Sequence, residues 1–99
     1  MKTRAASFNI DCTACLDATG KPISELPEFA RKSETLVALY SAMVKARTFD
    51  AKAIALQRTG RLGTYGSCLG QEAIGIGVAS AMNTSDVFLP SFREHGAQL

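Results

Sequence analysis

The sequence predicts a small, mostly helical α/β domain that follows an irregular N-terminal arm. Three observations predict this fold class. Apolar residues recur at helical spacing over residues 33–58. A second helical stretch, rich in small residues, covers residues 71–82, and the short apolar run at 87–89 ends at Pro90 as a buried strand would. With 99 residues, the chain has room for one such domain.

Composition and charge exclude several classes of protein. Hydrophobic residues make up 46% and charged residues 20% of the chain, as in ordinary soluble domains. A net charge of +2 gives no reason to expect a nucleic-acid or membrane-surface partner. The longest uncharged stretch, 73–85, is shorter than the roughly 20 residues of a membrane-spanning helix. We therefore expect a soluble protein of the bacterial cytoplasm. The mitochondrial matrix is less favoured, because Asp11 and Asp17 are unusual in a transit peptide.

The N-terminal arm and the first helix have recognisable boundary signals. Glycine and proline within residues 16–22 predict a turn, and Pro22 and Pro27 oppose a continuous helix over residues 1–30. Ser33 is the expected N-cap of the helix at 33–58, and Gly60 its left-handed C-terminal residue. Arg47 and Asp50 lie three residues apart, which predicts a surface pair worth about 0.2–0.5 kcal/mol.

Glycine dominates the segment after this helix. Residues 60–70 hold four glycines, which predicts a turn or a close approach of the backbone to another group. Gly75 and Gly77 lie inside the second helix, where each costs about 1 kcal/mol relative to alanine. Such glycines predict close packing against another helix. The run 87–89 is expected to form a short buried strand.

Two kinds of chemistry can be proposed from residue types alone. Cys12, Cys15, Cys68 and His95 are suitable zinc ligands, but no second paired-ligand motif supports a zinc site. Arg93 and His95 follow the apolar run, where an arginine and an imidazole are suited to hold an anionic phosphate. The alternative interpretation is an ordinary polar loop. The glycines at 75 and 77 do not form a dinucleotide fingerprint, because no strand precedes them.

Four sequence blocks occur in a specific order. They are RTFD at 47–50, LQRTG at 56–60, GQEA at 70–73 and FREHG at 92–96. In this order they resemble the alpha subunits of the thiamine-diphosphate-dependent 2-oxoacid dehydrogenases. The resemblance covers residues 47–99, with the pyruvate dehydrogenases closest and the branched-chain and acetoin enzymes as alternatives. It implies an N-terminal arm at 1–30. It also implies an incomplete thiamine-diphosphate-binding domain at 31–99, built as helix, glycine-rich loop, helix and strand.

The resemblance also implies roles for individual residues. Arg93 matches the arginine that contacts the diphosphate, and Phe92 stands where a tyrosine usually contacts the cofactor. His95 is a candidate catalytic residue on the substrate side. Four residues are expected to line the approach of the substrate: Tyr65, Gly66, Ser67 and Cys68. Within this set, Gly66 replaces a histidine that contacts substrate in some relatives.

The implied function is that of a subunit within a larger enzyme. We expect oxidative decarboxylation of pyruvate, with transfer of the acetyl unit to a lipoyl group. The implied partners are a beta subunit, in an α2β2 assembly, and the lipoyl-bearing second component, with no nucleic acid and no membrane. The implied cofactors are thiamine diphosphate and Mg²⁺, whose ligands we expect beyond Leu99.

The same resemblance predicts what this chain lacks. The Gly-Asp-Gly and Asn-Asn signature of the family's metal site does not occur in the sequence. We therefore expect an N-terminal piece of a longer protein, inactive alone, with uncovered apolar faces at 36–44 and 73–81. The alternative function is that of a non-catalytic helical interaction module derived from the same family.

Overall fold

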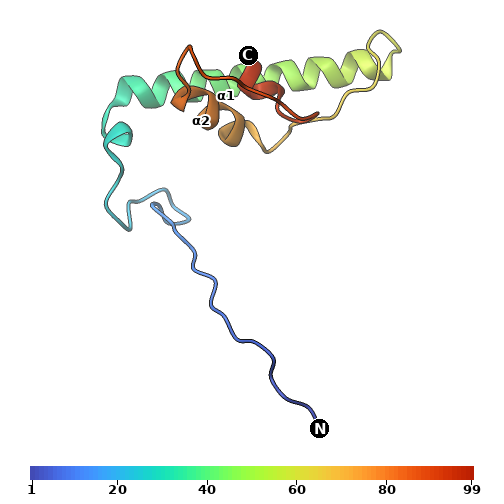
Figure 1. Cartoon of the computed structure of the whole chain (residues 1–99). Helices are drawn as coiled ribbons and strands as arrows, with labels where there is room; N and C mark the ends of the chain where they lie inside the picture. The colour runs from blue at the N-terminus through green and yellow to red at the C-terminus, as the bar shows by residue number, and fades with distance from the viewer. The chain divides into compact units, whose positions relative to one another are not determined.

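The computed structural model describes residues 1–99, which divide into two units, Met1–Arg31 and Lys32–Leu99. We describe each unit by itself. The first contains the 3-10 helix η1, Glu28–Arg31. The second contains α1, Ser33–Arg58, α2, Glu72–Ala81, and the 3-10 helix η2, His95–Gln98 (Figure 1). No β-strand forms, and the only β-type pairing is an isolated antiparallel bridge between Leu16 and Pro22.

In the first unit, the predicted turn at residues 16–22 is present. The Asp17 carboxylate accepts hydrogen bonds from the backbone N–H groups of Thr19, at 2.8 Å, and Lys21, at 3.0 Å. Gly20 adopts a positive φ of 83°, which a side chain would disfavour. The turn prediction is therefore confirmed. The short η1 helix, which begins directly after Pro27, was not predicted.

Helix α1 has the predicted bounds, but its N-terminus is not capped as predicted. It runs from Ser33 to Arg58, and Gly60 adopts the expected left-handed conformation with φ 71°. Ser33 is the first helical residue and not the N-cap, so that part of the prediction is wrong. Because η1 ends at Arg31, the chain enters α1 through Lys32, whose side chain makes no capping hydrogen bond.

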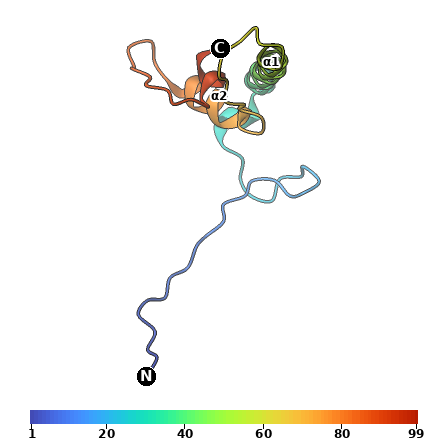
Figure 2. The same cartoon turned by 90° about the vertical axis from the view of Figure 1, so that its right-hand side faces the viewer.

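The second unit is built on three mutually contacting helices. Helix α2 and η2 both pack on α1, and the glycine-rich loop returns along α1 to the start of α2 (Figures 1 and 2). The buried face of α1 carries only small apolar side chains, Ala46 and Ala53, on either side of Asp50. Small side chains allow close approach, so a Cβ added at Gly96 of η2 would lie 3.7 Å from the Ala46 Cβ.

The two glycines inside α2 behave differently. A Cβ at Gly75 would lie 3.1 Å from the backbone nitrogen of Ala97, so close packing against η2 confirms the prediction at this position. Gly77 has no such neighbour within 4 Å, and the prediction of close contact there is wrong. The physical reason is that η2, with four residues, covers only one side of α2.

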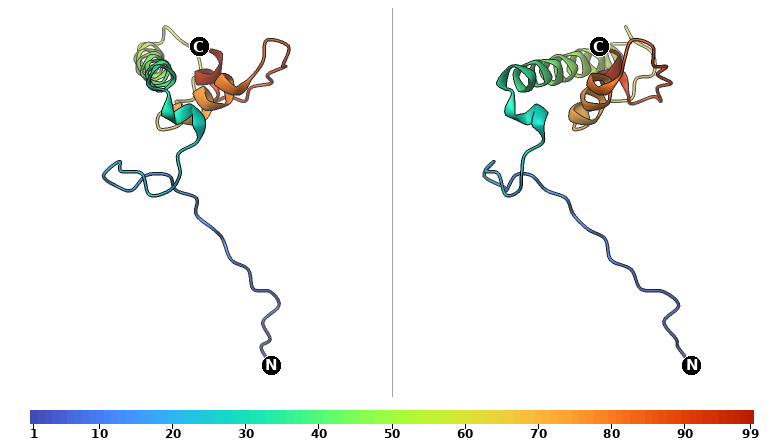
Figure 3. Two further views of the ribbon diagram at one scale, coloured as in Figure 1. Left: turned by 90° about the vertical axis from the view of Figure 1, so that its left-hand side faces the viewer. Right: turned by 60° about the vertical axis from the view of Figure 1, so that its left-hand side comes forward.

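The predicted strand at 87–89 is wrong. These residues are irregular, and Val87 and Leu89 are 82% and 87% exposed. A strand needs a neighbouring strand to pair its backbone groups, and none exists in this chain. The segment instead belongs to a loop that lies on the side of α2 remote from α1 (Figures 2 and 3). The observed fold is therefore helical, without the sheet of an α/β domain.

Large apolar side chains remain exposed on both helices, as expected for uncovered faces. On α1 they are Leu36, Val37, Tyr40, Val44 and Phe49, and on α2 they are Ile74 and Val78. Neither helix combines the length and the apolar character needed to cross a lipid bilayer.

Candidate functional site

Asp50 organises the end of the glycine-rich loop. Its side chain is 3% exposed and projects from the middle of α1. One carboxylate oxygen accepts hydrogen bonds from the Tyr65 hydroxyl, at 2.8 Å, and from the Cys68 backbone N–H, at 2.7 Å. The other accepts the Ser67 hydroxyl at 2.7 Å. The predicted surface pair of Arg47 with Asp50 is therefore wrong, because Asp50 faces inward and is saturated by loop donors.

These contacts shift the pKa values of the groups involved. Burial raises the pKa of Asp50, but hydrogen bonds from Cys68, Ser67 and Tyr65 outweigh it, so the pKa is lowered. The pKa of Tyr65 is raised by burial and by its hydrogen bond to the Asp50 carboxylate. Burial also raises the pKa of the Cys68 thiol. At neutral pH the site therefore holds one ionised carboxylate surrounded by neutral donors.

The C-terminal segment holds the same loop from the other side. The Arg93 guanidinium donates to the Ser67 carbonyl at 2.5 Å. The His95 Nε2 lies 3.0 Å from the Gly66 carbonyl, and the imidazole stacks on the Tyr65 ring with centroids 4.8 Å apart. The predicted substrate-approach residues at 65–68 thus lie beside Phe92 and Arg93, the predicted cofactor residues, and His95, the candidate catalytic residue.

Gly66 makes this approach possible. A Cβ at this position would lie 3.1 Å from the Phe92 ring and 3.3 Å from the Phe92 carbonyl oxygen. Phe92 itself is 71% exposed, and the Arg93 guanidinium carbon lies 5.1 Å from the centre of its ring. The absence of a side chain at residue 66 therefore lets residues 92–95 reach the loop backbone.

A second buried carboxylate fixes the start of α2. Glu72 is 7% exposed and forms an ion pair with the Nε of Arg47 on α1. Its hydrogen bond with Arg47 lowers the pKa of Glu72 to about 2. The pair joins α1 to α2 directly after the loop, so both ends of residues 65–72 are tied to α1 through carboxylates.

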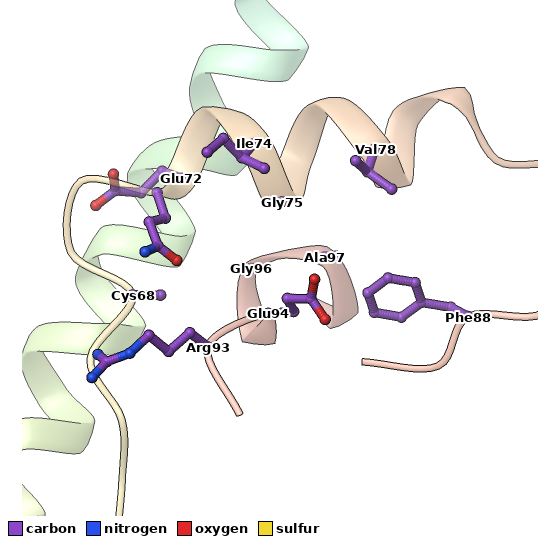
Figure 4. A pocket seen from close by; sticks show the side chains of 11 residues that line it. Cys68, Glu72, Ile74, Gly75, Val78, Phe88, Arg93, Glu94, Gly96 and Ala97 are labelled. Carbon is purple, nitrogen blue, oxygen red and sulfur yellow. The ribbon is translucent and has the colours of Figure 1, made fainter. Parts of the chain in front are cut away.

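A small pocket lies between α2, η2 and the loop (Figure 4). Its volume is about 90 Å³, and it is lined on one side by Ile74 and Val78 and on the other by Arg93 and Glu94. Sites for cofactor-sized ligands occupy roughly 300–1,000 Å³. This pocket is therefore too small to enclose thiamine diphosphate by itself, and three further hollows of about 350 Å³ each lie along α1.

The zinc alternative is not supported. No group of three or more histidine, cysteine, aspartate or glutamate side chains is placed to hold a metal ion. All three cysteines are free thiols. The His95 Nε2 instead contacts the Gly66 carbonyl.

Comparison with known proteins decides the family. Residues 40–99, more than half of the chain, match the family described as dehydrogenase E1 component. The chain belongs to this family. It is 42% identical over 78 residues to the pyruvate dehydrogenase E1 component subunit alpha of Acholeplasma laidlawii, covering 79% of this chain and 23% of that protein.

Two further relatives carry different names. The chain is 41% identical over 99 residues to the 3-methyl-2-oxobutanoate dehydrogenase subunit alpha of Mycobacterium tuberculosis, covering 94% of this chain and 26% of that protein. It is 36% identical over 90 residues to the mitochondrial 2-oxoisovalerate dehydrogenase subunit alpha 2 of Arabidopsis thaliana, covering 91% of this chain and 19% of that protein. The chain thus spans about a quarter or less of these relatives. No solved structure matches it.

The contacts of this member of the dehydrogenase E1 component family involve residues that were not predicted as site residues. Asp50 and Arg47 belong to the RTFD block that carried the resemblance, yet they were assigned only to a surface pair. Glu72 lies in the GQEA block of the resemblance, and its ion pair with Arg47 was not predicted. One available signal was the position of Asp50 between Ala46 and Ala53 on one helical face, next to a glycine-rich loop whose backbone donors need an acceptor.

Proposed function

We propose that this chain is part of the alpha subunit of a 2-oxoacid dehydrogenase first component. The proposed reaction is oxidative decarboxylation of pyruvate, with transfer of the acetyl unit to a lipoyl group. A branched-chain 2-oxoacid is the alternative substrate, because relatives at similar identity are named for 3-methyl-2-oxobutanoate and 2-oxoisovalerate. The pyruvate enzymes from Acholeplasma laidlawii and Staphylococcus epidermidis support the first choice and the bacterial cytoplasm as the compartment.

The observation that carries the proposal is the position of Arg93. Its guanidinium is held at the glycine-rich loop by the Ser67 carbonyl, a neutral acceptor that leaves its positive charge uncompensated. The neighbouring Glu94 carboxylate accepts the backbone N–H of Ser91 at 2.5 Å and forms no ion pair with Arg93. An exposed guanidinium with spare N–H donors is suited to bind a diphosphate through paired hydrogen bonds.

The remaining site residues have supporting roles in this proposal. Phe92 would contact the cofactor only through its ring, because it lacks a hydroxyl. His95, stacked on Tyr65, would lie on the substrate side together with Gly66, Ser67 and Cys68. Bound thiamine diphosphate supplies the carbon nucleophile for decarboxylation. Its Mg²⁺ would depend on oxygen ligands from outside these 99 residues, because the Gly-Asp-Gly and Asn-Asn signature does not occur in them.

The proposed partners are a beta subunit, in an α2β2 assembly, and the lipoyl-bearing second component. The exposed apolar faces of α1 and α2 are consistent with a need for further protein surface. We therefore expect the isolated chain, supplied with thiamine diphosphate and Mg²⁺ but no beta subunit, to release no CO₂ from pyruvate. Release of CO₂ by the isolated chain would contradict the shared-site proposal.

A decisive experiment uses the polypeptide encoded by the whole reading frame. Together with its beta subunit, it should decarboxylate pyruvate faster than 3-methyl-2-oxobutanoate. Arg93→Ala should raise the KM for thiamine diphosphate about tenfold, the effect of losing one charge-assisted hydrogen bond. Arg61→Ala, which removes an exposed arginine from the other end of the loop, is the matched control. An assembly that decarboxylates neither 2-oxoacid would overturn the proposal.

The second candidate function is a non-catalytic interaction module. The observation that favours it is the set of exposed apolar faces on α1 and α2. A stably folded chain that binds neither thiamine diphosphate nor a beta subunit would support this function in place of the enzyme subunit.

A further inference from the structure

We propose that Asp50 is a positioning residue for Arg93 and acts on it through the backbone of residues 66–68. The inference deepens the proposed function, because it explains how the proposed diphosphate-binding arginine is held. It concerns a residue that touches neither Arg93 nor the space in which an anion would bind. The evidence is a continuous series of hydrogen bonds from α1, through the loop, to the C-terminal segment.

The first part of this series joins Asp50 to the loop. The carboxylate accepts three hydrogen bonds of 2.7–2.8 Å from two side chains, Tyr65 and Ser67, and from the backbone N–H of Cys68. The Cys68 N–H and the Ser67 carbonyl belong to the same planar peptide group. When Asp50 fixes that N–H, it also fixes the direction in which the Ser67 carbonyl points.

The second part joins the loop to Arg93. The Ser67 carbonyl accepts the Arg93 guanidinium N–H at 2.5 Å. Arg93 forms no ion pair with a carboxylate, and its other contact is with Phe92, whose exposed ring can rotate. The one hydrogen bond that orients the guanidinium therefore uses the carbonyl of the peptide group that Asp50 holds.

The charge of Asp50 fits this role. Its two oxygens are taken up by neutral donors from the loop, and it does not face Arg93. It can therefore order the loop without neutralising the guanidinium that an anion would need. His95 adds a parallel contact to the Gly66 carbonyl, at 3.0 Å, so the loop is held on both sides.

The first test needs no cofactor and uses the full chain. The Arg93 Nη–H resonance is assigned by its loss in Arg93→Lys, and amide exchange is measured at Cys68. Asp50→Ala should shift that resonance and speed Cys68 exchange by about tenfold or more, because the N–H loses its acceptor. Asp50→Asn should restore both signals, because an amide oxygen can still accept from Cys68 and Tyr65 while its NH₂ group donates to Ser67.

Two controls make this test decisive. Glu72→Gln weakens the ion pair with Arg47 but touches neither Ser67 nor Arg93, so it should leave the Arg93 resonance in place. If Asp50→Ala does not fold, Asp50→Ser, whose shorter side chain does not reach the Cys68 N–H, should produce the same shift. An Arg93 resonance that is unchanged when Asp50 is replaced by alanine or serine would overturn the proposal.

The second test is a double-mutant cycle in the assembled enzyme. Asp50→Ala should raise the KM for thiamine diphosphate about tenfold, as Arg93→Ala does, and the double variant should show no further rise. Additive effects would mean that Asp50 acts independently of Arg93 and would contradict the proposal. If the wild-type assembly needs no thiamine diphosphate, the proposed function fails, while the resonance test still decides the link between Asp50 and Arg93.

Discussion

Asp50 and Glu72 are the two buried charged residues of this chain, and both use their charge to hold a segment against α1. Asp50 accepts three loop donors, and Glu72 pairs with Arg47. A buried carboxylate is costly unless its oxygens are satisfied, and no buried side-chain polar atom lacks a partner here. These two residues therefore hold the glycine-rich loop and α2 against α1 through hydrogen bonds and an ion pair.

Stability should depend on pH through these carboxylates. The pKa of Glu72 is lowered from 4.5 to about 2 by Arg47, and the pKa of Asp50 is also lowered by its donors. Because both pKa values are depressed in the folded state, their contribution is complete above about pH 4.5. It is lost as the pH falls toward 2. The melting temperature, followed by circular dichroism, should fall in that range.

Two variants check this assignment. Glu72→Gln should melt lower than wild type at pH 7, and the difference should shrink as the pH approaches 2. Glu25→Gln removes an exposed pair with Arg31 and should change little at any pH. A constant difference between wild type and Glu72→Gln from pH 7 to pH 2 would show that the Glu72 charge is not responsible.

Gly66→Ala should disturb the contact between the loop and residues 92–95. The added Cβ would meet the Phe92 ring at 3.1 Å and the Phe92 carbonyl at 3.3 Å. The ring can move, but the backbone must shift, so we expect a loss of about 1 kcal/mol in the free energy of unfolding by urea. Gly63→Ala, with no atom within 4 Å, should have no such effect. Equal effects at both positions would contradict the packing argument.

At the scale of elements, sequence periodicity predicts helices well and loop contacts poorly. The bounds of α1 and the turn at 16–22 follow from local signals, which each segment carries in its own residues. The prediction of a strand at 87–89 was wrong because a strand depends on a neighbouring strand, and this chain contains none. Asp50 was misplaced for a similar reason, since its donors lie 15 to 18 residues away in the sequence. A pattern three residues apart cannot reveal such partners.

Two glycine substitutions within α2 should have opposite effects. At Gly75 an added Cβ would meet the backbone of Ala97 at 3.1 Å, so η2 must move, and we expect Gly75→Ala to lower stability by about 1 kcal/mol or more. At Gly77 the space is open, so Gly77→Ala should raise stability by about 1 kcal/mol through helix propensity. Urea unfolding monitored by helix content measures both. Stabilisation by both substitutions would show that η2 does not pack on α2.

At the scale of the whole molecule, the candidate site is assembled from α1, the glycine-rich loop and the C-terminal segment. Each contributes part of a binding surface: the anchoring carboxylate, the backbone carbonyls and the guanidinium. The buried apolar residues are only four, Ala46, Ala53, Cys68 and Ile76, and Ile76 is the one large side chain among them. The resemblance assigns site roles to residues in 65–68 and 92–95, but their proximity and its cause, the Asp50 anchor, are visible only in three dimensions.

The exposed apolar faces should make the isolated chain associate. Val37 on α1 is 64% exposed and Ile74 on α2 is 70% exposed, and each lies among further exposed apolar side chains. Removing such surface from water is worth roughly 25 cal/mol per Å², so contact between copies is favourable. Sedimentation should show association that rises with concentration. Val37→Glu and Ile74→Glu should weaken it without loss of helix content. Lys52→Gln makes the same change in net charge on an exposed polar position of α1, and association that weakens equally in this variant would point to charge, not apolar contact.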